Sequence, residues 1–391
     1  MQRPPTLFSH LTRCLYATEF ARAVSQYPNR KPPRGLSAYD HFLALCFGQL
    51  TGRESLRDVV TCLNSRSDRL YHMGFRGRLT RTSLAYGNRH RDWRLFQAVA
   101  QVLMRRAAAL YPSAPADPER PSVIFALDST IISLSLALFP WGFYARSRQA
   151  AVKLHVLLSL QGHLPAWAVV TQPHLGDMRM LEQIPLYPGA HYVMDRGYMD
   201  FARLLRLHRH GVYFVVRCKE PVRFKVLQRH RVDRVAGLRC DQRVRLSSSW
   251  SKNSYPEALR KIRFFDSEHQ VMLVLLTNNL EAAPEVITEL YRRRWQVELF
   301  FKWMKQHLRL RAFYGRSQNA VRCQIWCAIC AYLMVAILKK QARIEKSLND
   351  MVRICSVNIF SQEPLAEIFA NEITPQTQTR GAHAIQNTLP F

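Results

Sequence analysis

The sequence has 391 residues, of which 48% are hydrophobic, so it can form two or three domains with at least one sizeable core. Lysine and arginine number 56 against 28 acidic residues, which gives a formal net charge of +28. Such an excess, spread along nearly the whole chain, predicts a nucleic-acid partner, because each cation that neutralises a phosphate releases a condensed counterion. It argues against a basic membrane-surface protein, whose charge would be concentrated in one helix or tail.

Nine scattered cysteines, an odd number, indicate reduced thiols in a cytoplasmic protein. Cys323, Cys327 and Cys330 lie at helical spacing in an apolar run and lack a matched second pair, which favours buried thiols over a zinc site. That run, residues 323–338, is short for a membrane span. The first 14 residues lack the apolar core of a signal peptide. We therefore expect a soluble, cytoplasmic protein without a membrane partner.

Residues 1–112 have the pattern of an all-helical domain that binds DNA. Ser37 and Asp40 form a capping-box pattern before an apolar run. A turn rich in glycine and arginine at 70–77 precedes a basic segment at 80–90. Short helices, a glycine turn and a basic third helix are compatible with a helix-turn-helix reader of DNA. A solvated helix face explains the same arginines equally well.

Residues 113–121 are rich in proline and are predicted to be a linker. Residues 122–218 then change to short apolar runs bounded by turns, which are typical of strands in the core of an α/β domain. The predicted strands are 123–127, 151–160, 164–171, 191–194 and 212–216, with helical segments at 177–185 and 201–210.

The rest of the chain falls into three parts. Residues 219–277 look mainly β, and residues 278–345 are predicted to be helical. Residues 346–391 carry few apolar positions toward their end and are predicted to be a loosely ordered tail. The predicted strands of the β-rich part are 239–246, 261–265 and 271–276.

Two acidic residues stand directly after predicted strands. Asp128 follows the apolar run 123–127, and Asp195 follows 191–194. In open α/β sheets, functional sites gather at the carboxyl ends of strands, where a loop exposes a side chain that the strand positions rigidly. The alternative is that each aspartate only starts a turn or caps a helix.

A third acidic residue lies on a predicted helix with two cations and a phenol. At about 100° of rotation per residue, Tyr291, Arg294, Glu298 and Lys305 fall within an arc of roughly 60°. A separate apolar stripe would dock that helix on the sheet. The alternative is an exposed face on which Glu298 pairs with Arg294 and Lys302. The stripe consists of Val297, Phe300, Phe301, Met304 and Leu308.

Three carboxylates held close together repel one another, so they require bound cations or raised pKa values. Carboxylate oxygens suit Mg²⁺ or Mn²⁺. Two such ions about 4 Å apart can activate a water or a 3′-hydroxyl and stabilise the leaving oxygen. This chemistry suits the cutting and joining of phosphodiesters, with Arg294 and Lys305 holding the DNA backbone.

The acids and cations also stand in a recognisable pattern. Its parts are Asp128 in ALDST, Asp195 in MDRGY, and the series Tyr291-x2-Arg294-x3-Glu298-x6-Lys305. The pattern resembles the two acid boxes and the Tyr-Arg-Glu-Lys signature of cut-and-paste insertion-sequence transposases, the family of insertion sequence four. The resemblance extends to about residue 345. It implies an α/β, RNase H-like core with a β-rich insertion before the catalytic helix.

The resemblance also implies roles for single residues. The acids would bind two Mg²⁺ ions, or Mn²⁺, and the signature residues Tyr291, Arg294 and Lys305 would contact the transposon end. Arg196 is a candidate phosphate contact beside the second acid. Trp250, the only tryptophan between residues 219 and 277, is a candidate to stack a flipped base during hairpin formation, with a core tryptophan as the alternative. The implied metal ligands are Asp128, Asp195 and Glu298.

The chain departs from the family pattern at one point. Where related sequences tend to carry a His-Asp pair after the third strand, this chain has Gly176-Asp177, which puts a helper role there in doubt. His155, on the second predicted strand, is either near the site or a core histidine with satisfied hydrogen bonds, and we expect the latter.

The resemblance implies a DNA transposase that binds terminal inverted repeats as a homodimer across two ends. It would cut through a hairpin route and join the 3′ ends to double-stranded target DNA. Two alternatives stay open: a transposase-derived DNA-binding protein without catalytic activity, and a metal-dependent nuclease that cuts without joining. The presence of all three acids favours the enzyme over the inactive relative.

Overall fold

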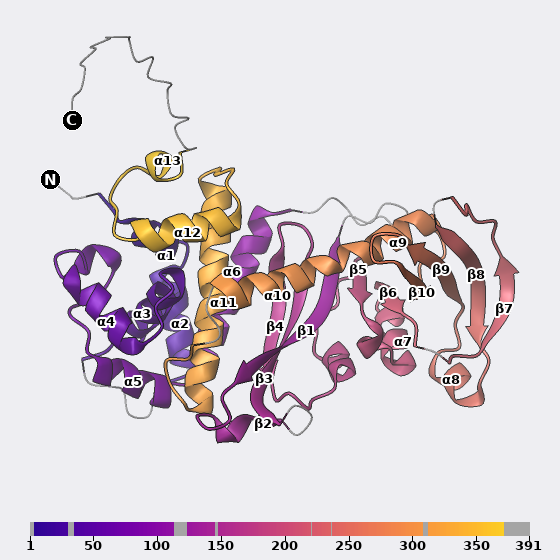
Figure 1. The fold of residues 1–391 in the computed structure, drawn as a ribbon, viewed down its shortest axis with the longest axis horizontal. Coiled ribbons are helices and arrows are strands. Elements are labelled where there is room, and N and C mark those ends of the chain that lie inside the picture. The colour runs from indigo at the N-terminus through magenta and orange to yellow at the C-terminus, as the bar shows by residue number, and fades with distance from the viewer. Residues whose placement is uncertain are drawn as a thin grey trace, which may run out of the picture.

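The computed structural model describes residues 4–29, 35–112, 123–144, 148–219, 221–235, 237–307 and 312–370. The predicted linker at 113–121 and the far end of the predicted tail, residues 371–391, lie outside these ranges. In the described chain, a group of N-terminal helices stands beside one large mixed sheet, and helices from the C-terminal part connect the two (Figure 1).

The described part of the N-terminal region is helical, as predicted. Helix α3 begins where the capping pattern predicts: the Ser37 hydroxyl accepts a hydrogen bond of 2.9 Å from the Asp40 amide and donates one of 2.6 Å to its carboxylate. The helices here are α1 Leu7–Thr12, α2 Ala17–Gln26, α3 Ala38–Leu50, α4 Leu56–Ser65, α5 Arg81–His90 and α6 Arg94–Leu110, with the short 3₁₀ helix η1 Tyr71–Met73.

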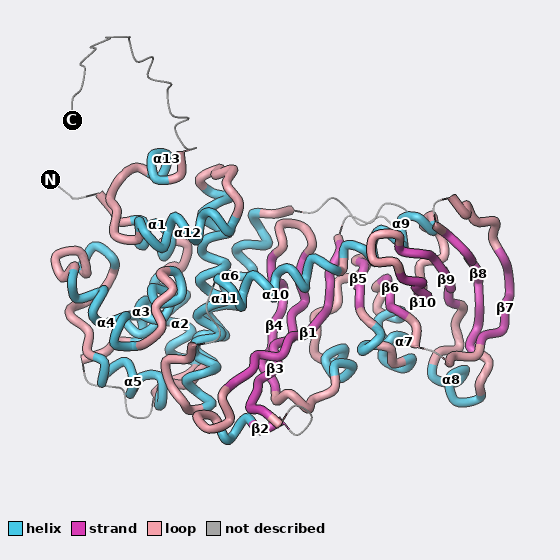
Figure 2. The backbone as a smooth tube through the Cα atoms, viewed as in Figure 1, coloured by secondary structure: helices cyan, strands magenta, loops and turns pink. Residues whose placement is uncertain are grey.

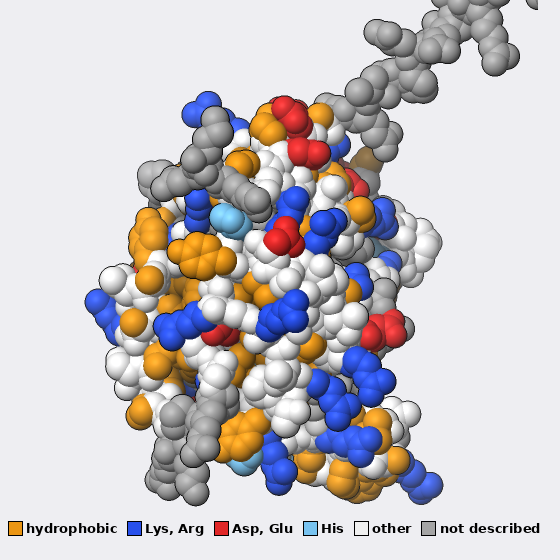
Figure 3. Space-filling view, turned by 90° about the vertical axis from the view of Figure 1, so that its left-hand side faces the viewer, with side chains coloured by type: hydrophobic (Ala, Val, Ile, Leu, Met, Phe, Trp, Pro, Cys, Tyr) orange, Lys and Arg blue, Asp and Glu red, His pale blue; other side chains and the backbone are white. Residues whose placement is uncertain are grey.

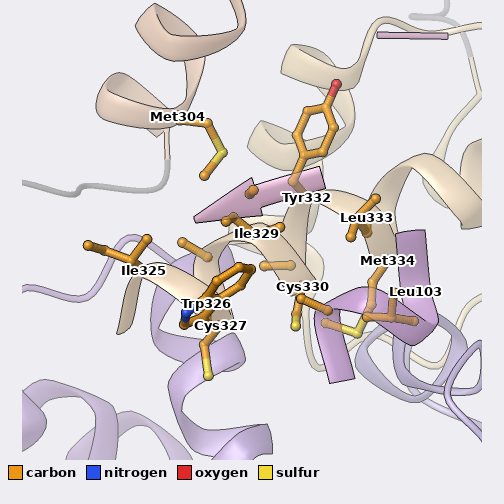
Figure 4. Close-up of a cluster of buried hydrophobic side chains, with 14 of the residues drawn as sticks. Leu103, Met304, Ile325, Trp326, Cys327, Ile329, Cys330, Tyr332, Leu333 and Met334 are labelled. Carbon is orange, nitrogen blue, oxygen red and sulfur yellow. The ribbon is translucent and has the colours of Figure 1, made fainter. Parts of the chain in front are cut away.

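The long helix α11, Gln318–Gln341, joins the N-terminal helices to the sheet. It contacts α1, α3, α5 and α6, and it also contacts strand β4, Leu164–Thr171. By length and composition α11 could cross a membrane, but 94% of its apolar window is buried inside the molecule, as in a core helix. Figure 4 shows Trp326 and Ile329 of this helix among side chains of other elements, including Leu103 and Met304.

The three cysteines of α11 are interior thiols, as predicted. Cys323, Cys327 and Cys330 are completely buried, and burial raises the pKa of each thiol. A zinc ligand is a thiolate, so this environment opposes metal binding. All nine cysteines of the chain are free.

The sheet has the strand order β2-β3-β1-β5-β6-β10-β9-β8-β7, with β4 paired to β3. Strands β4, β3 and β1 are antiparallel neighbours, whereas β1, β5 and β6 run parallel. This β4-β3-β1-β5-β6 arrangement is the expected RNase H-like core. The strands are β1 Ile124–Leu134, β2 Phe143–Tyr144, β3 Gln149–Ser159, β5 His191–Met194, β6 Tyr213–Arg217, β7 Phe224–Arg229, β8 Leu238–Leu246, β9 Leu259–Asp266 and β10 Val271–Thr277.

The β-rich insertion extends the sheet of the core. Strand β10 pairs antiparallel with β6, and β9, β8 and β7 follow in order (Figure 2). The insertion also contains a short helix, α8 Ser249–Ser254. A buried ion pair anchors it: Arg260 Nη2 lies 2.7 Å from Asp241 Oδ2, and Arg260 also donates to the carbonyl of Ala282. Ala282 directly precedes the helices that follow the insertion.

Successive side chains of β1 belong alternately to two separate hydrophobic cores. Ile124 and Ala126 belong to the core formed with α6, α11 and the helix that carries Glu298. Phe125 and Leu127 belong to the core on the other face, with helix α7, Phe201–Arg209. The sheet is therefore covered on both faces, which explains the continuous apolar run that predicted this strand.

The prediction of a loosely ordered tail from residue 346 is wrong for most of its first half. Ser347 caps helix α12, Leu348–Asn358, whose Met351 and Cys355 are completely buried. A second short helix, α13, spans Leu365–Ile368. These two residues, one helical turn apart, lie on the buried side of α12, which contacts α1, α3, α11 and the helix that carries Glu298.

Candidate active site

Strands β1 and β5 place the first two acids side by side. The two strands pair in parallel as far as Leu127 opposite Met194, so Asp128 and Asp195 are the next residue on each strand. The prediction that β1 ends at Asp128 is wrong, because β1 continues to Leu134 along its antiparallel partner β3. The aspartate nevertheless stands where the parallel pairing stops, and this is the feature that the apolar run indicated.

The third acid comes from a helix laid across β1. Helix α9, Pro284–Arg293, and helix α10, Trp295–His307, meet at Arg294, which keeps helical backbone angles of φ −52° and ψ −34°. The predicted apolar stripe of α10 is buried in the core over β1, and Glu298 lies on the flank of the helix. The buried stripe consists of Val297, Phe300, Phe301 and Met304, and Leu308 lies outside the described residues.

Arg294 joins two of the acids. Its Nη1 lies 3.3 Å from Asp128 Oδ2, and its Nη2 lies 2.6 Å from Glu298 Oε1. The Tyr291 hydroxyl donates a long hydrogen bond of 3.4 Å to Asp195 Oδ1. The alternative is thus correct for the Arg294–Glu298 pair, but in the described chain Glu298 forms no ion pair with Lys302, and the same guanidinium reaches the first acid as well. Tyr291, Arg294 and the three acids therefore form one connected group.

Burial dominates the electrostatics of this group. It raises the pKa of Asp128 to about 6, and the neighbouring negative charges of Glu298 and Asp195 act in the same direction. The Ser129 amide and Arg294 oppose this rise without cancelling it. Burial likewise raises the pKa of Tyr291 to about 12, so this phenol is a hydrogen-bond donor at neutral pH.

The donor set fits a divalent cation. All three side chains offer carboxylate oxygens, the ligands that Mg²⁺ and Mn²⁺ prefer. The negative charge at Asp128 is not fully compensated, and the guanidinium of Arg294 is bound to two acids. Both features indicate a place that attracts positive charge. In the described chain, one group of three possible metal ligands has its donor atoms all within 4.8 Å of one another, namely Asp266, Glu268 and His269 at the β9–β10 turn. The donor atoms of Asp128, Asp195 and Glu298 are further apart than that. To share one ion, the three acids of the triad would have to move closer together.

A basic cavity lies beside Asp195. Arg196 is exposed at the start of the short helix that follows this acid. Together with Arg217 and Lys219 it lines a cavity of about 470 Å³, completed by Cys218, Met272 and Val274. Sequence reasoning missed Arg217 and Lys219. The signal was present, because both follow closely after the predicted strand 212–216, as Asp195 follows the strand 191–194.

The other predicted contacts lie further from the acids. Lys305 is half-buried on α10, two turns beyond Glu298. Residue 250 lies in α8, which contacts α7 and β8, at the lower edge of the insertion in Figure 1, whereas α9 lies at its upper edge. The side chain of Trp250 is outside the described part of the chain. Its stacking role therefore stays a prediction.

The N-terminal helices form a basic face, but not the expected tight motif. Residues 66–80, with η1, separate α4 from α5, whereas a helix-turn-helix has a turn of about 3–4 residues. Arg81 and Arg89 of α5 are exposed. Arg91 points inward and donates to the carbonyls of Leu36 and Ser37. Figure 3 shows basic side chains distributed over this side of the molecule.

Two family models match the chain. One, described as a transposase DDE domain, matches residues 119–334, which hold all three acids. The other, a domain of unknown function named DUF4372, matches residues 3–76 in the helical N-terminal region.

Three curated proteins are similar to the chain over about 60% of its length. A Sinorhizobium fredii protein described as transposase y4zB is 30% identical over 249 residues, which are 62% of this chain and 68% of that protein. The transposase described for element IS5377 of Geobacillus stearothermophilus is 30% identical over 60% of this chain and 62% of its own length. One described for element IS4SA of Synechocystis is 29% identical, over 59% of this chain and 64% of its own length.

Among solved structures, the chain is similar to a piggyBac transposase synaptic complex with hairpin DNA, determined by cryo-electron microscopy. The TM-score is 0.47 and the identity 10%, over 97% of this chain and 90% of that one. A similarity of this strength supports no statement about the present chain.

Proposed function

The chain belongs to the family of the transposase DDE domain, and from that membership we propose that it moves an insertion sequence by cutting and pasting double-stranded DNA. The observation that carries the proposal is the meeting of the three acids. Asp128 and Asp195 stand at adjacent positions of two parallel strands, and Arg294 ties Glu298 to the first of them. The substrates are the terminal inverted repeats of the element and a target duplex.

Asp128, Asp195 and Glu298 are the proposed ligands of two divalent ions, Mg²⁺ or Mn²⁺. When bound, such ions activate an attacking water or 3′-hydroxyl and stabilise the leaving oxygen. Arg294 has to release at least one carboxylate before both acids can act as ligands. The freed guanidinium then presents a fork of donors that matches a phosphate of the cut strand.

Other cations of the chain contact the DNA at positions further from the acids. Arg196, Arg217 and Lys219 line one cavity and can bind consecutive phosphates of the strand beside Asp195. Lys305 extends the contact along α10. The exposed arginines of α5 supply a further contact for the duplex, and the net charge of +28 supports the same partner.

The proposal includes the assembly and the place of action. Two copies of the chain pair the two ends of the element, and the cleaved ends pass through hairpins before they join the target. Trp250 remains the candidate to stack a flipped base in that step. The reaction takes place in the cytoplasm, where nine free thiols stay reduced.

Excision tests the proposal directly. Purified protein and Mg²⁺ are added to a DNA fragment that contains the reading frame with its flanks, and the products of the wild type and Asp128→Asn are compared on denaturing gels. We expect excised, hairpin-ended DNA from the wild type alone. Binding of the ends without any cutting, in Mg²⁺ and in Mn²⁺, would identify the inactive DNA-binding relative instead.

The nuclease alternative requires a second readout. Pre-cut transposon ends are incubated with a supercoiled plasmid, and joined products are detected by sequencing across the junctions. A transposase joins the 3′ ends to the plasmid, whereas a nuclease produces nicks without junctions.

A further inference from the structure

A polar network centred on Asp177 lies behind the two aspartates of the site. Asp177 opens the short helix η3, Asp177–Glu182. Its Oδ1 accepts a hydrogen bond of 2.7 Å from the Ser129 hydroxyl and lies 2.7 Å from the Lys153 ammonium. Lys153 is only 9% exposed and also donates to the carbonyl of Leu175. A partly exposed carboxylate and a nearly buried ammonium are thus held together at this face of the sheet.

The network occupies the face of the sheet opposite Arg294. In the β1–β3 register, Ser129 lies opposite His155 and Asp128 opposite Val156, so the two members of each pair share a face. Val156 belongs to the core beneath α10. Ser129, Lys153 and His155 therefore face the other way.

His155 closes the network from the interior. It is completely buried, its Nε2 lies 2.9 Å from Thr171 Oγ1, and its Nδ1 lies 3.5 Å from Asp177 Oδ1. Burial lowers the pKa of this imidazole to about 4, so it is neutral at neutral pH. The expected position in the core is confirmed, but the expectation of satisfied hydrogen bonds is not, because only Nε2 has a hydrogen-bond partner among the described residues. The ring packs directly against Asp177.

Asp177 contacts both segments that carry the aspartates. Ser129 connects it to the first acid, because the Ser129 amide donates a hydrogen bond of 2.8 Å to Asp128 Oδ1. On its other side, Asp177 Oδ2 lies 3.6 Å from the position that a Cβ would take at Gly197, two residues after Asp195. The side chain therefore stands between the two acid boxes, bonded to one and next to the other, where the backbone pairing of β1 with β5 has ended.

We propose that Asp177, held by Lys153, is a positioning residue that fixes the spacing of Asp128 and Asp195 for metal binding. This inference rests on the proposed function of the same site. The carboxylates of a metal site have to be held within about 0.5 Å of their working positions, and partners one layer behind the ligands provide that restraint. Lys153 neutralises Asp177, so a fourth carboxylate adds no net repulsion to the three acids.

The test compares Asp177→Ala and Ser129→Ala with Glu182→Ala. Glu182 lies on the same 3₁₀ helix, but its ion pair is with Arg203 of α7 at the surface. Isothermal titration of the DNA-free protein with Mn²⁺ alone gives metal affinity, and end cleavage at a series of Mg²⁺ concentrations gives the metal midpoint. Melting temperature without metal and binding of end DNA are measured in parallel.

We expect Asp177→Ala to weaken Mn²⁺ binding and raise the Mg²⁺ midpoint by about 10- to 100-fold. Ser129→Ala, which leaves no buried charge unpaired, should change both in the same direction by less. Cleavage should recover at high Mg²⁺, and binding of end DNA should stay unchanged. Glu182→Ala should behave as the wild type does.

Wild-type metal affinity and midpoint in both Ser129→Ala and Asp177→Ala would overturn the inference while leaving the proposed function intact. Equal losses in Glu182→Ala, or losses in Ser129→Ala that track a lower melting temperature, would reduce Asp177 to a structural role. If Asp177→Ala does not fold, Ser129→Ala decides alone. A wild type that binds no Mn²⁺ and cuts no DNA would overturn both proposals.

Discussion

At the scale of single residues, Arg294 holds the place that a metal ion would take between two carboxylates. Its guanidinium bridges Asp128 and Glu298, and this cation makes a close group of half-buried acids tolerable. We propose that the signature arginine has two uses in succession, first as an internal counterion and then as a phosphate ligand. Replacing one acid by its amide separates these uses, because the amide keeps the shape and loses the charge.

Glu298→Gln should abolish cleavage and leave binding of the ends almost unchanged. A neutral side-chain amide is a weaker ligand for a divalent ion than a carboxylate, whereas the DNA contacts of the chain come from its cations. Gel-shift titrations and cleavage assays on the same end fragment measure the two effects. Cleavage near the wild-type rate would remove Glu298 from the metal site.

The raised pKa of Asp128 predicts how the metal-free protein responds to pH. The folded state keeps this proton up to about pH 6, whereas the unfolded chain loses it near 3.8, so the contribution of Asp128 to stability falls as the pH rises through that window. The melting temperature of the wild type should therefore decrease relative to that of Asp128→Asn between about pH 4 and about pH 6. Thermal melts in EDTA check this, and parallel curves for the two proteins would contradict it.

Lys305→Ala should weaken binding of the ends and reduce its dependence on salt. One phosphate contact contributes about 0.9 to the slope of log K against log salt concentration. Binding isotherms at several salt concentrations give that slope. If the slope does not change, Lys305 contacts no phosphate.

At the scale of elements, a buried ion pair is one of the features that connect the insertion to helices α9 and α10, beside ring contacts of His269 with Trp295 and of Arg292 with Phe264. Arg260 on β9 binds Asp241 on β8 and the carbonyl just before α9. The side chains are only 8% and 2% exposed, so neither charge can be hydrated if its partner is lost. The insertion therefore helps to set the position of the helix pair that carries Tyr291 and Glu298.

Asp241→Ala should lower the free energy of unfolding by about 3–5 kcal/mol, because it leaves Arg260 buried and unpaired. The double variant Asp241→Leu with Arg260→Met, which removes both charges, should recover most of this loss. Urea denaturation of the single and double variants measures the difference. A double variant as unstable as Asp241→Ala would mean that the loss comes from packing rather than from the unpaired charge.

The elements also show what can be predicted from a sequence. Strands β4 and β5 match their predicted bounds to the residue, because each is an apolar run between clear turns. Strand β7 was not predicted, since it lies at the sheet edge with nearly all side chains exposed and leaves no burial pattern. The three acids followed from strand ends and helical spacing. The role of Asp177 depends on contacts with β1 and β3 that no local pattern encodes.

At the scale of the whole molecule, one sheet and one helix unite all parts of the described chain. The sheet runs from β2 through the core to β7, and the insertion continues it without a break in pairing. Helix α11 contacts four N-terminal helices as well as β4. The described segments near the two ends also meet, since the Leu7 amide donates to the carbonyl of Ser361. The N-terminal helices are thus part of the same body as the acids.

We propose that α11 makes the molecule a caliper, because it fixes the distance between the N-terminal helices and the three acids. A DNA-binding domain on a flexible linker could bind its recognition sequence at varying distances from the cleavage point. A domain that is packed rigidly against the catalytic core through a buried helix would accept only one distance between the two. Inserting about five base pairs, half a helical turn, between the recognised repeat and the cleavage point should therefore abolish cutting rather than shift it. Mapping of the cleavage position on such spaced ends tests this. A cleavage position that shifts together with the repeat would mean that the N-terminal helices and the acids are not held at a fixed distance.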